Sequence, residues 1–323
     1  MPEAAAGTPA PLIRVEALTK RFPGVVALDE LTVDVAPGIV GLVGANGAGK
    51  STLIKILLGL LAPTSGRVEV MGYDPTTQGT RLRRYVGYMP EHPALPPDVS
   101  ATEFVAQAGR LSGLPTKVAR ERTADVLRHV GLAEERYRPI AGYSTGMRQR
   151  VQLAQAIVHD PRLLLLDEPT NGLDPAGRDE MLGLIRRTGT EFGIAIVLAS
   201  HLLGEIEAVC DHLVAIDGGR LLRAAPMAAF TAETGILTVE VEEGRDALAA
   251  GLADRGLRVL EGSGGADRTV RIALDGGAPF NIVRDTVADL GLPLVRMEHG
   301  RHSLEDLFRD DLPATAVTTG ATE

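Results

Sequence analysis

The most constraining feature of this chain is a glycine-rich segment, GANGAGKST, at residues 44–52. It follows a short apolar run at residues 39–43 and precedes residues 53–61, where apolar side chains recur at helical spacing. Strand, glycine loop and helix in this order are the setting in which the pattern G-x-x-x-x-G-K-[ST] binds phosphate. The segment therefore predicts an α/β fold of the P-loop NTPase type.

The glycines of this loop allow successive backbone N–H groups to converge on phosphate oxygens, and the helix start adds the positive end of its dipole. Lys50 supplies a mobile cation, and Ser51 offers a hydroxyl to Mg²⁺. A glycine-rich turn with an unrelated lysine is the alternative, which the complete motif and its setting disfavour. The residues expected to contact ATP in this loop are Gly44, Ala45, Asn46, Gly47, Ala48, Gly49, Lys50, Ser51 and Thr52.

A pair of carboxylates follows a second apolar run. Asp167 and Glu168 come directly after the apolar residues 163–166, and a further apolar run spans residues 194–199. Continuous apolar runs are typical of central parallel strands, whose carboxyl ends bind ligands. We expect Asp167 to hold Mg²⁺, through water, and Glu168 to polarise the attacking water as a general base. A solvated acidic pair in the turn before Pro169 is the alternative.

Composition narrows the classes of function. The net charge is −9 and aromatic residues make up 3% of the chain, so the basic surface and stacking rings of a nucleic-acid-binding protein are not evident. The apolar runs are far shorter than the roughly 20 residues of a membrane-spanning helix. Cys210 is the only cysteine, which rules out a disulfide within the chain and fits a reducing compartment. No nucleic acid is expected as a partner.

The large domain is expected to span residues 12–225. Alternation of apolar and polar residues predicts strands at 12–18 and 31–35, with a loop around Phe22 and Pro23 between them, so the domain opens with an antiparallel β subdomain. Helical periodicity in the middle of the domain predicts a helical subdomain at about residues 92–160.

The character of the sequence changes near residue 226. Residues 226–311 show strand and helix patterns in the order β-α-β-β-α-β, which predicts a small C-terminal α+β domain of ferredoxin-like type. A capped helix is expected at residues 303–309. Residues 1–11 and 312–323 are predicted to be disordered tails.

Further motifs carry a resemblance to one family. The sequence YSTGMRQ at residues 143–149 resembles the signature of ABC ATPases, usually written L-S-G-G-Q. The sequence DEPTNGLDP at residues 167–175 is similar to the Walker B and D-loop run of that family, and Ser200-His201 to its switch histidine. These elements stand in family order over about residues 12–225, so the chain resembles the ATP-binding subunits of ABC transporters.

This resemblance implies a Mg²⁺-dependent ATPase that forms a head-to-tail dimer with a second copy of itself or a homologous ATPase subunit. Lys50, Glu168 and His201 are then the catalytic residues, with His201 sensing the γ-phosphate, and Asp174 links the two sites. Alternatively, His201 is structural and Asp174 forms the turn before Pro175. The signature residues that would face the phosphate loop of the other subunit are Ser144, Thr145, Gly146 and Met147.

The sequence departs from the family pattern at several positions. Phe22 stands where the family places an aromatic ring under adenine, although it could equally belong to the core. Thr145 and Met147 replace the usual Gly and Gln of the signature, which leaves Ser144 and Gly146 as the expected phosphate contacts. Glu91 occupies the place of the Q-loop glutamine that touches Mg²⁺, so it is a candidate metal ligand.

These departures, together with the C-terminal domain, resemble the ABC-2 type subfamily, which mostly serves exporters. The resemblance implies an integral membrane permease as partner and a location at the cytoplasmic face of the cell membrane. One alternative is a soluble ABC-type ATPase acting on ribosomes or DNA, although the second cassette or long coiled coil of such proteins is not present. Another is a nucleotide-gated switch with little hydrolysis.

Overall fold

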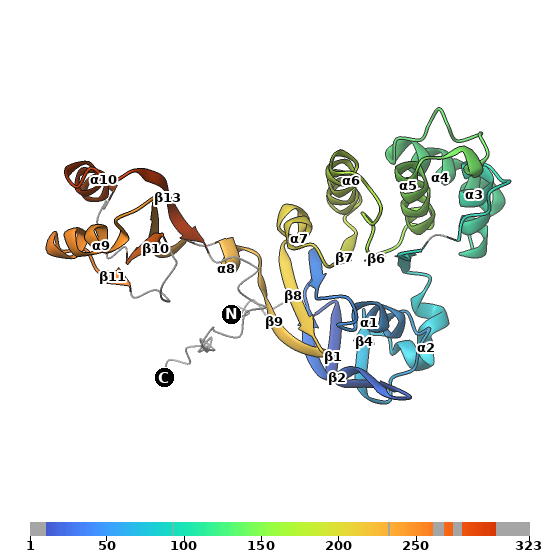
Figure 1. Cartoon of the computed structure of the whole chain (residues 1–323). Helices are drawn as coiled ribbons and strands as arrows, with labels where there is room; N and C mark the ends of the chain where they lie inside the picture. The colour runs from blue at the N-terminus through green and yellow to red at the C-terminus, as the bar shows by residue number, and fades with distance from the viewer. Residues whose placement is uncertain (1–10, 93, 232, 261–267, 274–279, 302–323) are drawn as a thin grey trace, which may run out of the picture. The chain divides into compact units, whose positions relative to one another are not determined.

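The computed structural model describes residues 11–92, 94–231, 233–260, 268–273 and 280–301 (Figure 1). The described residues form two compact units, one ending at Met227 and the other beginning at Ala228. Apart from residue 11, the predicted tails lie outside the described residues, as does the predicted helix at 303–309. Within the described part of the chain, no helix is both long enough and apolar enough to cross a membrane.

A six-stranded sheet forms the centre of the first unit and joins strands from distant parts of the sequence. The strands β3, β6 and β7 are buried along their whole length, so the prediction of central parallel strands is confirmed. Five strands run parallel and the last runs antiparallel to its neighbour. The order across the sheet is β5 (Val86–Met89), β6 (Leu163–Asp167), β7 (Ala195–Ser200), β3 (Ile39–Val43), β8 (His212–Asp217) and β9 (Arg220–Pro226).

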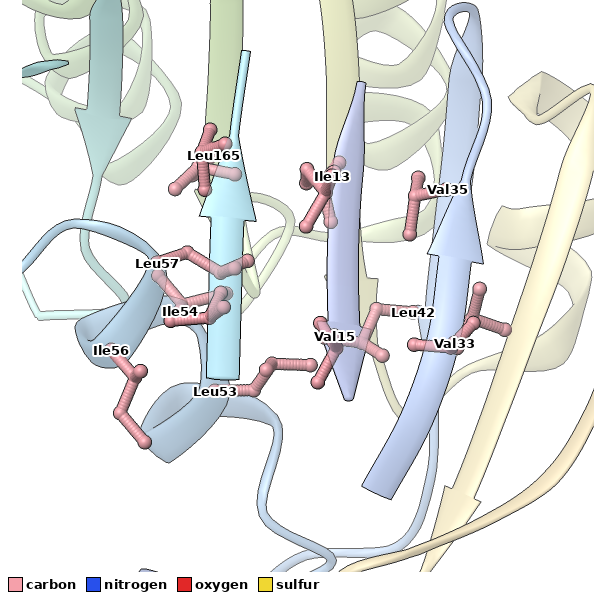
Figure 2. Close-up of a cluster of buried hydrophobic side chains, with 14 of the residues drawn as sticks. Ile13, Val15, Val33, Val35, Leu42, Leu53, Ile54, Ile56, Leu57 and Leu165 are labelled. Carbon is pink, nitrogen blue, oxygen red and sulfur yellow. The ribbon is translucent and has the colours of Figure 1, made fainter. Parts of the chain in front are cut away.

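A second, antiparallel sheet has the order β2 (Val25–Val35), β1 (Ile13–Phe22) and β4 (Ser65–Val70). Apolar side chains of this sheet and of the six-stranded sheet form one hydrophobic core. Helix α1 (Lys50–Leu57), which follows the glycine loop, packs its buried side chains into that core. Figure 2 shows Leu53 and Leu57 of α1 in one buried cluster with side chains of both sheets. This shared core fixes the helix that begins at the loop.

The first two strands are longer than predicted, and the loop expected between them is a tight turn. β1 continues to Phe22 and β2 begins at Val25, so Phe22 is a strand residue. The pairing of the two strands shifts register between Val15 and Leu18, and twice more further along β1. Such irregularities interrupt the two-residue alternation by which a strand is recognised, which is why the prediction ended at Leu18.

Three helices, α3 (Ala101–Leu111), α4 (Thr116–His129) and α5 (Thr145–Ile157), form the helical subdomain between β5 and β6 (Figure 1). A capping box starts α3: Ser100 accepts a hydrogen bond from the N–H of Glu103, whose carboxylate accepts one from the N–H of Ser100. Other elements of this unit are α2 (Pro75–Leu82), the 3-10 helix η1 (Ile140–Gly142), α6 (Pro175–Phe192) and α7 (Leu203–Val209).

The second unit opens with the short helix α8 (Ala228–Thr231) and then has the predicted β-α-β-β-α-β order. Its sheet has the order β11-β12-β10-β13, and helices α9 and α10 pack with it around a separate apolar core. The elements are β10 (Glu233–Val241), α9 (Arg245–Asp254), β11 (Val259–Leu260), β12 (Thr269–Ala273), α10 (Phe280–Asp289) and β13 (Leu294–Arg301). The prediction of a ferredoxin-like unit is confirmed.

Candidate nucleotide-binding site

The loop between β3 and α1 accepts only glycine at two of its positions. Gly49 has a φ of +106°, in the left-handed region, and a Cβ there would lie 2.5 Å from the carbonyl oxygen of Ala27. A Cβ on Gly44 would collide with the carbonyl oxygen of Ile216. Backbone carbonyl groups of β2 and β8 therefore lie directly against the loop, and both positions require a residue without a side chain.

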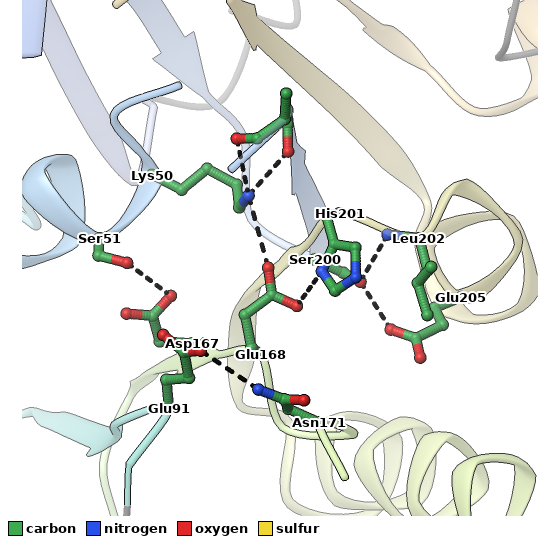
Figure 3. A network of polar contacts seen from close by, with 12 residues as sticks. Lys50, Ser51, Glu91, Asp167, Glu168, Asn171, Ser200, His201, Leu202 and Glu205 are labelled. Atoms are coloured by element: carbon green, nitrogen blue, oxygen red, sulfur yellow. Dashed lines mark hydrogen bonds and ion pairs between the residues drawn. The ribbon is translucent and has the colours of Figure 1, made fainter. Parts of the chain in front are cut away.

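Lys50 begins α1 and is buried beneath this loop. Its Nζ donates a hydrogen bond to the carbonyl oxygen of Gly44 at 2.7 Å and lies 3.4 Å from Oε1 of Glu168. The cation and its carboxylate partner are both nearly excluded from water, so neither is a loosely solvated surface charge. The ammonium group thus lies between the predicted phosphate loop and the predicted general base (Figure 3).

Glu168 has an unusual backbone conformation for a residue other than glycine, with a φ of +51°. This left-handed conformation follows directly on β6 and carries strain of about 1–2 kcal/mol. The N–H of Glu168 donates to the carbonyl oxygen of Ala199 at 2.9 Å, and its Oε2 lies 2.8 Å from Nδ1 of His201. The strained turn therefore directs the carboxylate between Lys50 and His201.

Asp167 lies beside the hydroxyl of Ser51, which donates to its Oδ1 at 3.2 Å. Burial raises the pKa of the Asp167 carboxyl, and the neighbouring Glu91 and Glu168 carboxylates raise it further, against the Ser51 hydrogen bond. Oxygen ligands of this kind suit Mg²⁺, which usually binds one or two carboxylates together with substrate phosphates and water. Among the described residues, no group of three or more acidic, His or Cys side chains forms a complete metal site.

Glu91 follows β5, and its side chain lies beside Asp167 (Figure 3). Its Oε1 accepts a hydrogen bond from Nδ2 of Asn171 at 3.2 Å. Burial, followed by the charges of Asp167 and Glu91, raises the pKa of Tyr88 to about 12. The structure thus places the Glu91 carboxylate in the same part of the site as the Asp167 carboxylate.

Four hydrogen bonds of this site were not predicted from the sequence. Asn171, within the Walker B run, holds Glu91, and Gln149 of α5 donates to the carbonyl oxygen of Asn171 at 3.3 Å. Ser200 donates to Oε2 of Glu205 at 2.6 Å and accepts the N–H of Leu202 at 3.0 Å, which fixes the turn that carries His201. The sequence signal that could have indicated Glu205 was its position as an acidic residue in the first turn of α7.

Replacing Ser200 with alanine is expected to lower the free energy of unfolding by about 1.5–3 kcal/mol, because a buried carboxylate loses its hydrogen-bond donor. Glu205 is buried, and its other oxygen has no partner within the described part of the chain. Urea denaturation measures the change. The control is Ser112→Ala, since the Ser112 hydroxyl is exposed and, among the described residues, bonds only the Ala108 carbonyl. Equal stabilities of the two variants would contradict this interpretation.

Phe22 lies at the end of β1 with 42% of its surface exposed, so the interpretation of this ring as a core residue is wrong. The Nζ of Lys20 stands 5.1 Å from the centre of the ring. The exposed face leaves adenine stacking as the remaining prediction for Phe22.

Among the described residues, the signature residues form no hydrogen bond or ion pair with Lys50 or Glu168. They line an open cavity of about 620 Å³, together with Asp174. Ser144 caps α5 by accepting the N–H of Met147, and Asp174 caps α6 by accepting the N–H of Gly177 at 2.9 Å. The capping of α6 gives Asp174 a structural role before Pro175. The N-termini of α5 and α6 both lie at this cavity.

Comparisons with known proteins agree with this geometry. Residues 28–171 match the family model described as ABC transporter. The bacitracin transport ATP-binding protein BcrA of Bacillus licheniformis is 39% identical over 216 residues, which cover 67% of this chain and 70% of that protein. The Nod factor export ATP-binding protein I of Ralstonia nicotianae is 34% identical over 305 residues, 92% of each chain.

Among solved structures, cbiO1 from Clostridium perfringens, part of the ABC transporter complex cbiONQ, superimposes with a TM-score of 0.63 at 28% identity. The similarity covers 68% of this chain and 90% of that one. The chain belongs to the family of ABC transporter ATP-binding proteins, which are ATPases.

Proposed function

We propose that this chain hydrolyses Mg²⁺-ATP in a dimer and thereby drives export of a substrate through a separate membrane permease. The observation that carries the proposal is the buried Glu168 carboxylate, held between the Lys50 ammonium and the His201 ring. A carboxylate at this point, next to a phosphate loop, is suited to orient and deprotonate a water molecule that attacks the γ-phosphate.

Each residue of the site has a role in this mechanism. Lys50 exchanges its loop carbonyl for phosphate oxygens, while the N–H groups of the loop bind the phosphates. Ser51 and Asp167 would hold Mg²⁺, with Glu91 beside them. The metal ion would neutralise negative charge on the phosphates. His201 keeps Glu168 turned toward the attacking water and meets the γ-phosphate. Phe22 offers its exposed face to adenine.

A dimer explains the separation between the signature and the phosphate loop. The N-terminus of α5 lies at the open cavity, and the positive end of its helix dipole suits a phosphate group. An isologous pair would bring each signature to the phosphate loop of the other copy, with Asp174 joining the two sites. The partner in this arrangement is a second copy of the chain or a homologous ATPase subunit.

Export is supported by the relative that is named for Nod factor export, and transport more generally by the relative that is named for bacitracin transport. We therefore propose a position at the cytoplasmic face of the cell membrane, attached through the permease. The test is purification of the tagged chain from detergent-solubilised membranes, followed by identification of the co-purifying proteins. Recovery of an integral membrane protein that raises Mg²⁺-ATP turnover supports the proposal, whereas co-sedimentation with ribosomes in its place contradicts it.

Replacing Glu91 with glutamine is expected to reduce the Mg²⁺ dependence of ATP binding. A carboxylate about 4 Å from a phosphate charge repels it by about 4 kcal/mol at intermediate dielectric, and a metal ion offsets that repulsion. In EDTA, the variant should therefore bind ATP at least about tenfold more tightly than the wild type. With saturating Mg²⁺ the two affinities should be similar, as measured by titration calorimetry.

The control for this experiment is Glu121→Gln, because Glu121 is exposed and lies on α4 beside Lys117. It removes the same charge from the chain without touching the site. An unchanged Mg²⁺ dependence in the Glu91 variant would show that Glu91 lies away from the bound phosphates.

A further inference from the structure

A cavity of about 760 Å³ opens at the surface of the helical subdomain, between α3 and α4. Arg110 of α3, Arg120 of α4 and Arg136 of the following loop line it, against the single carboxylate of Glu103. None of its lining residues belongs to the nucleotide site or to the signature cavity. The chain as a whole is acidic, with a net charge of −9, so this cavity concentrates charge of the opposite sign.

The cavity arginines differ from others in the same subdomain. Arg122 pairs with Asp160 at 3.0 Å, and Arg150 pairs with Glu180 at 2.6 Å. Within the described part of the chain, the three cavity arginines form no ion pair, and the Glu103 carboxylate accepts the hydrogen bonds of the α3 capping box. Glu103 offsets the charge of one arginine, so the lining keeps an excess of positive charge.

The loop that carries Arg136 is anchored. The carbonyl oxygen of Arg136 accepts two hydrogen bonds from Thr102, from its N–H and its hydroxyl, both at 3.0 Å. Its guanidinium carbon lies 4.9 Å from the centre of the Tyr137 ring, while its Nε is buried and has no hydrogen-bond partner in the described structure. A buried N–H donor without a partner costs about 1–3 kcal/mol, so the guanidinium of Arg136 is held at the cavity without satisfying all of its own donors.

We infer that this cavity binds a phosphate group. Guanidinium groups match phosphate geometry with paired N–H donors, and three of them can neutralise one phosphate completely. Tyr137 and Leu111, which are 69% and 82% exposed, stand at the same cavity and offer apolar surface to the remainder of the ligand. The phosphate belongs either to a soluble phosphorylated molecule or to the headgroup of an anionic phospholipid.

The test compares the full-length wild type with the cavity variant Arg110→Gln, Arg120→Gln, Arg136→Gln. The charge-matched control is Arg81→Gln, Arg84→Gln, Arg187→Gln, because these three arginines are exposed and do not line the cavity. All samples contain saturating Mg²⁺-ADP, so that the phosphate loop is occupied. Unchanged ATPase activity of both variants verifies that they are folded.

One arm measures co-sedimentation of the protein with phosphatidylcholine vesicles that contain either no phosphatidylglycerol or about 30% of it. The other arm follows ³¹P line broadening of inorganic phosphate on addition of the chain. We expect binding in at least one arm that the cavity variant weakens by about tenfold or more, while the control retains it. The arm that responds identifies the source of the phosphate. Binding in neither arm, or equal binding by the cavity and control variants, would overturn the inference.

Discussion

Replacing Glu168 with glutamine is expected to lower the rate of ATP hydrolysis by at least about 100-fold, because a positioned general base contributes about 10² to 10⁴ to a rate. Glutamine keeps the shape of the side chain and can still accept a hydrogen bond from His201, but it cannot take a proton. ATP affinity should remain within a few-fold of the wild type. Phosphate release and nucleotide titration measure the two quantities separately.

The control for Glu168→Gln is Glu207→Gln, which removes the same charge from an exposed position on α7. Its turnover should equal that of the wild type. Normal hydrolysis by the Glu168 variant would remove Glu168 from its proposed role and leave the His201 contact as a purely structural one. A loss of ATP binding equal to the loss of rate would point to damage of the site rather than of the chemical step.

Replacing Lys50 with alanine is expected to weaken ATP binding by about ten- to a hundredfold, since a hydrogen bond to a charged group contributes about 1.5–3 kcal/mol. The variant also leaves Glu168 as a buried carboxylate without its cation, which destabilises the fold. Urea denaturation should accompany the binding titration, so that loss of affinity is measured only on folded protein.

The control for Lys50→Ala is Lys55→Ala, because Lys55 is exposed in the last turn of the same helix. This variant should keep both its affinity for ATP and its stability. Unchanged ATP affinity in the folded Lys50 variant would show that this ammonium does not bind the phosphates.

Much of the first unit was predictable because its elements have strong local patterns. The strand before Gly44, the helix that begins at Lys50 and the apolar strand before Asp167 each carry a complete signal over a few adjacent residues. The continuous apolar runs also predicted the burial of central parallel strands. The extent of β1 was not predictable, because bulges shift its alternation and only pairing with β2 reveals where it ends.

The contacts within the site could not be predicted from the motifs alone. Residue types at Asp167, Glu168 and His201 indicated their chemistry, but the bond between Glu168 and His201 depends on a left-handed backbone after β6. That conformation is rare outside glycine, so no sequence pattern indicates it. The Glu91 contact with Asn171 joins residues from two separate loops, and only the fold brings them together.

Phe22 illustrates the same limit for burial. An aromatic residue in a strand is suited to a core or to a ligand, and the sequence left both interpretations open. The observed exposure of Phe22 goes with its position at the end of β1, next to the turn. Its pairing partner Val25 is also exposed, so this end of the hairpin projects from the core.

We expect each hydrolytic site to be completed by the signature of another copy of the chain. The mass of the Glu168→Gln variant, measured by multi-angle light scattering with Mg²⁺-ATP and with Mg²⁺-ADP, tests this arrangement. We expect twice the mass of one chain in ATP, a single chain in ADP, and loss of the ATP-dependent dimer when Ser144→Arg is added. A mass that stays at one chain in ATP would rule this dimer out.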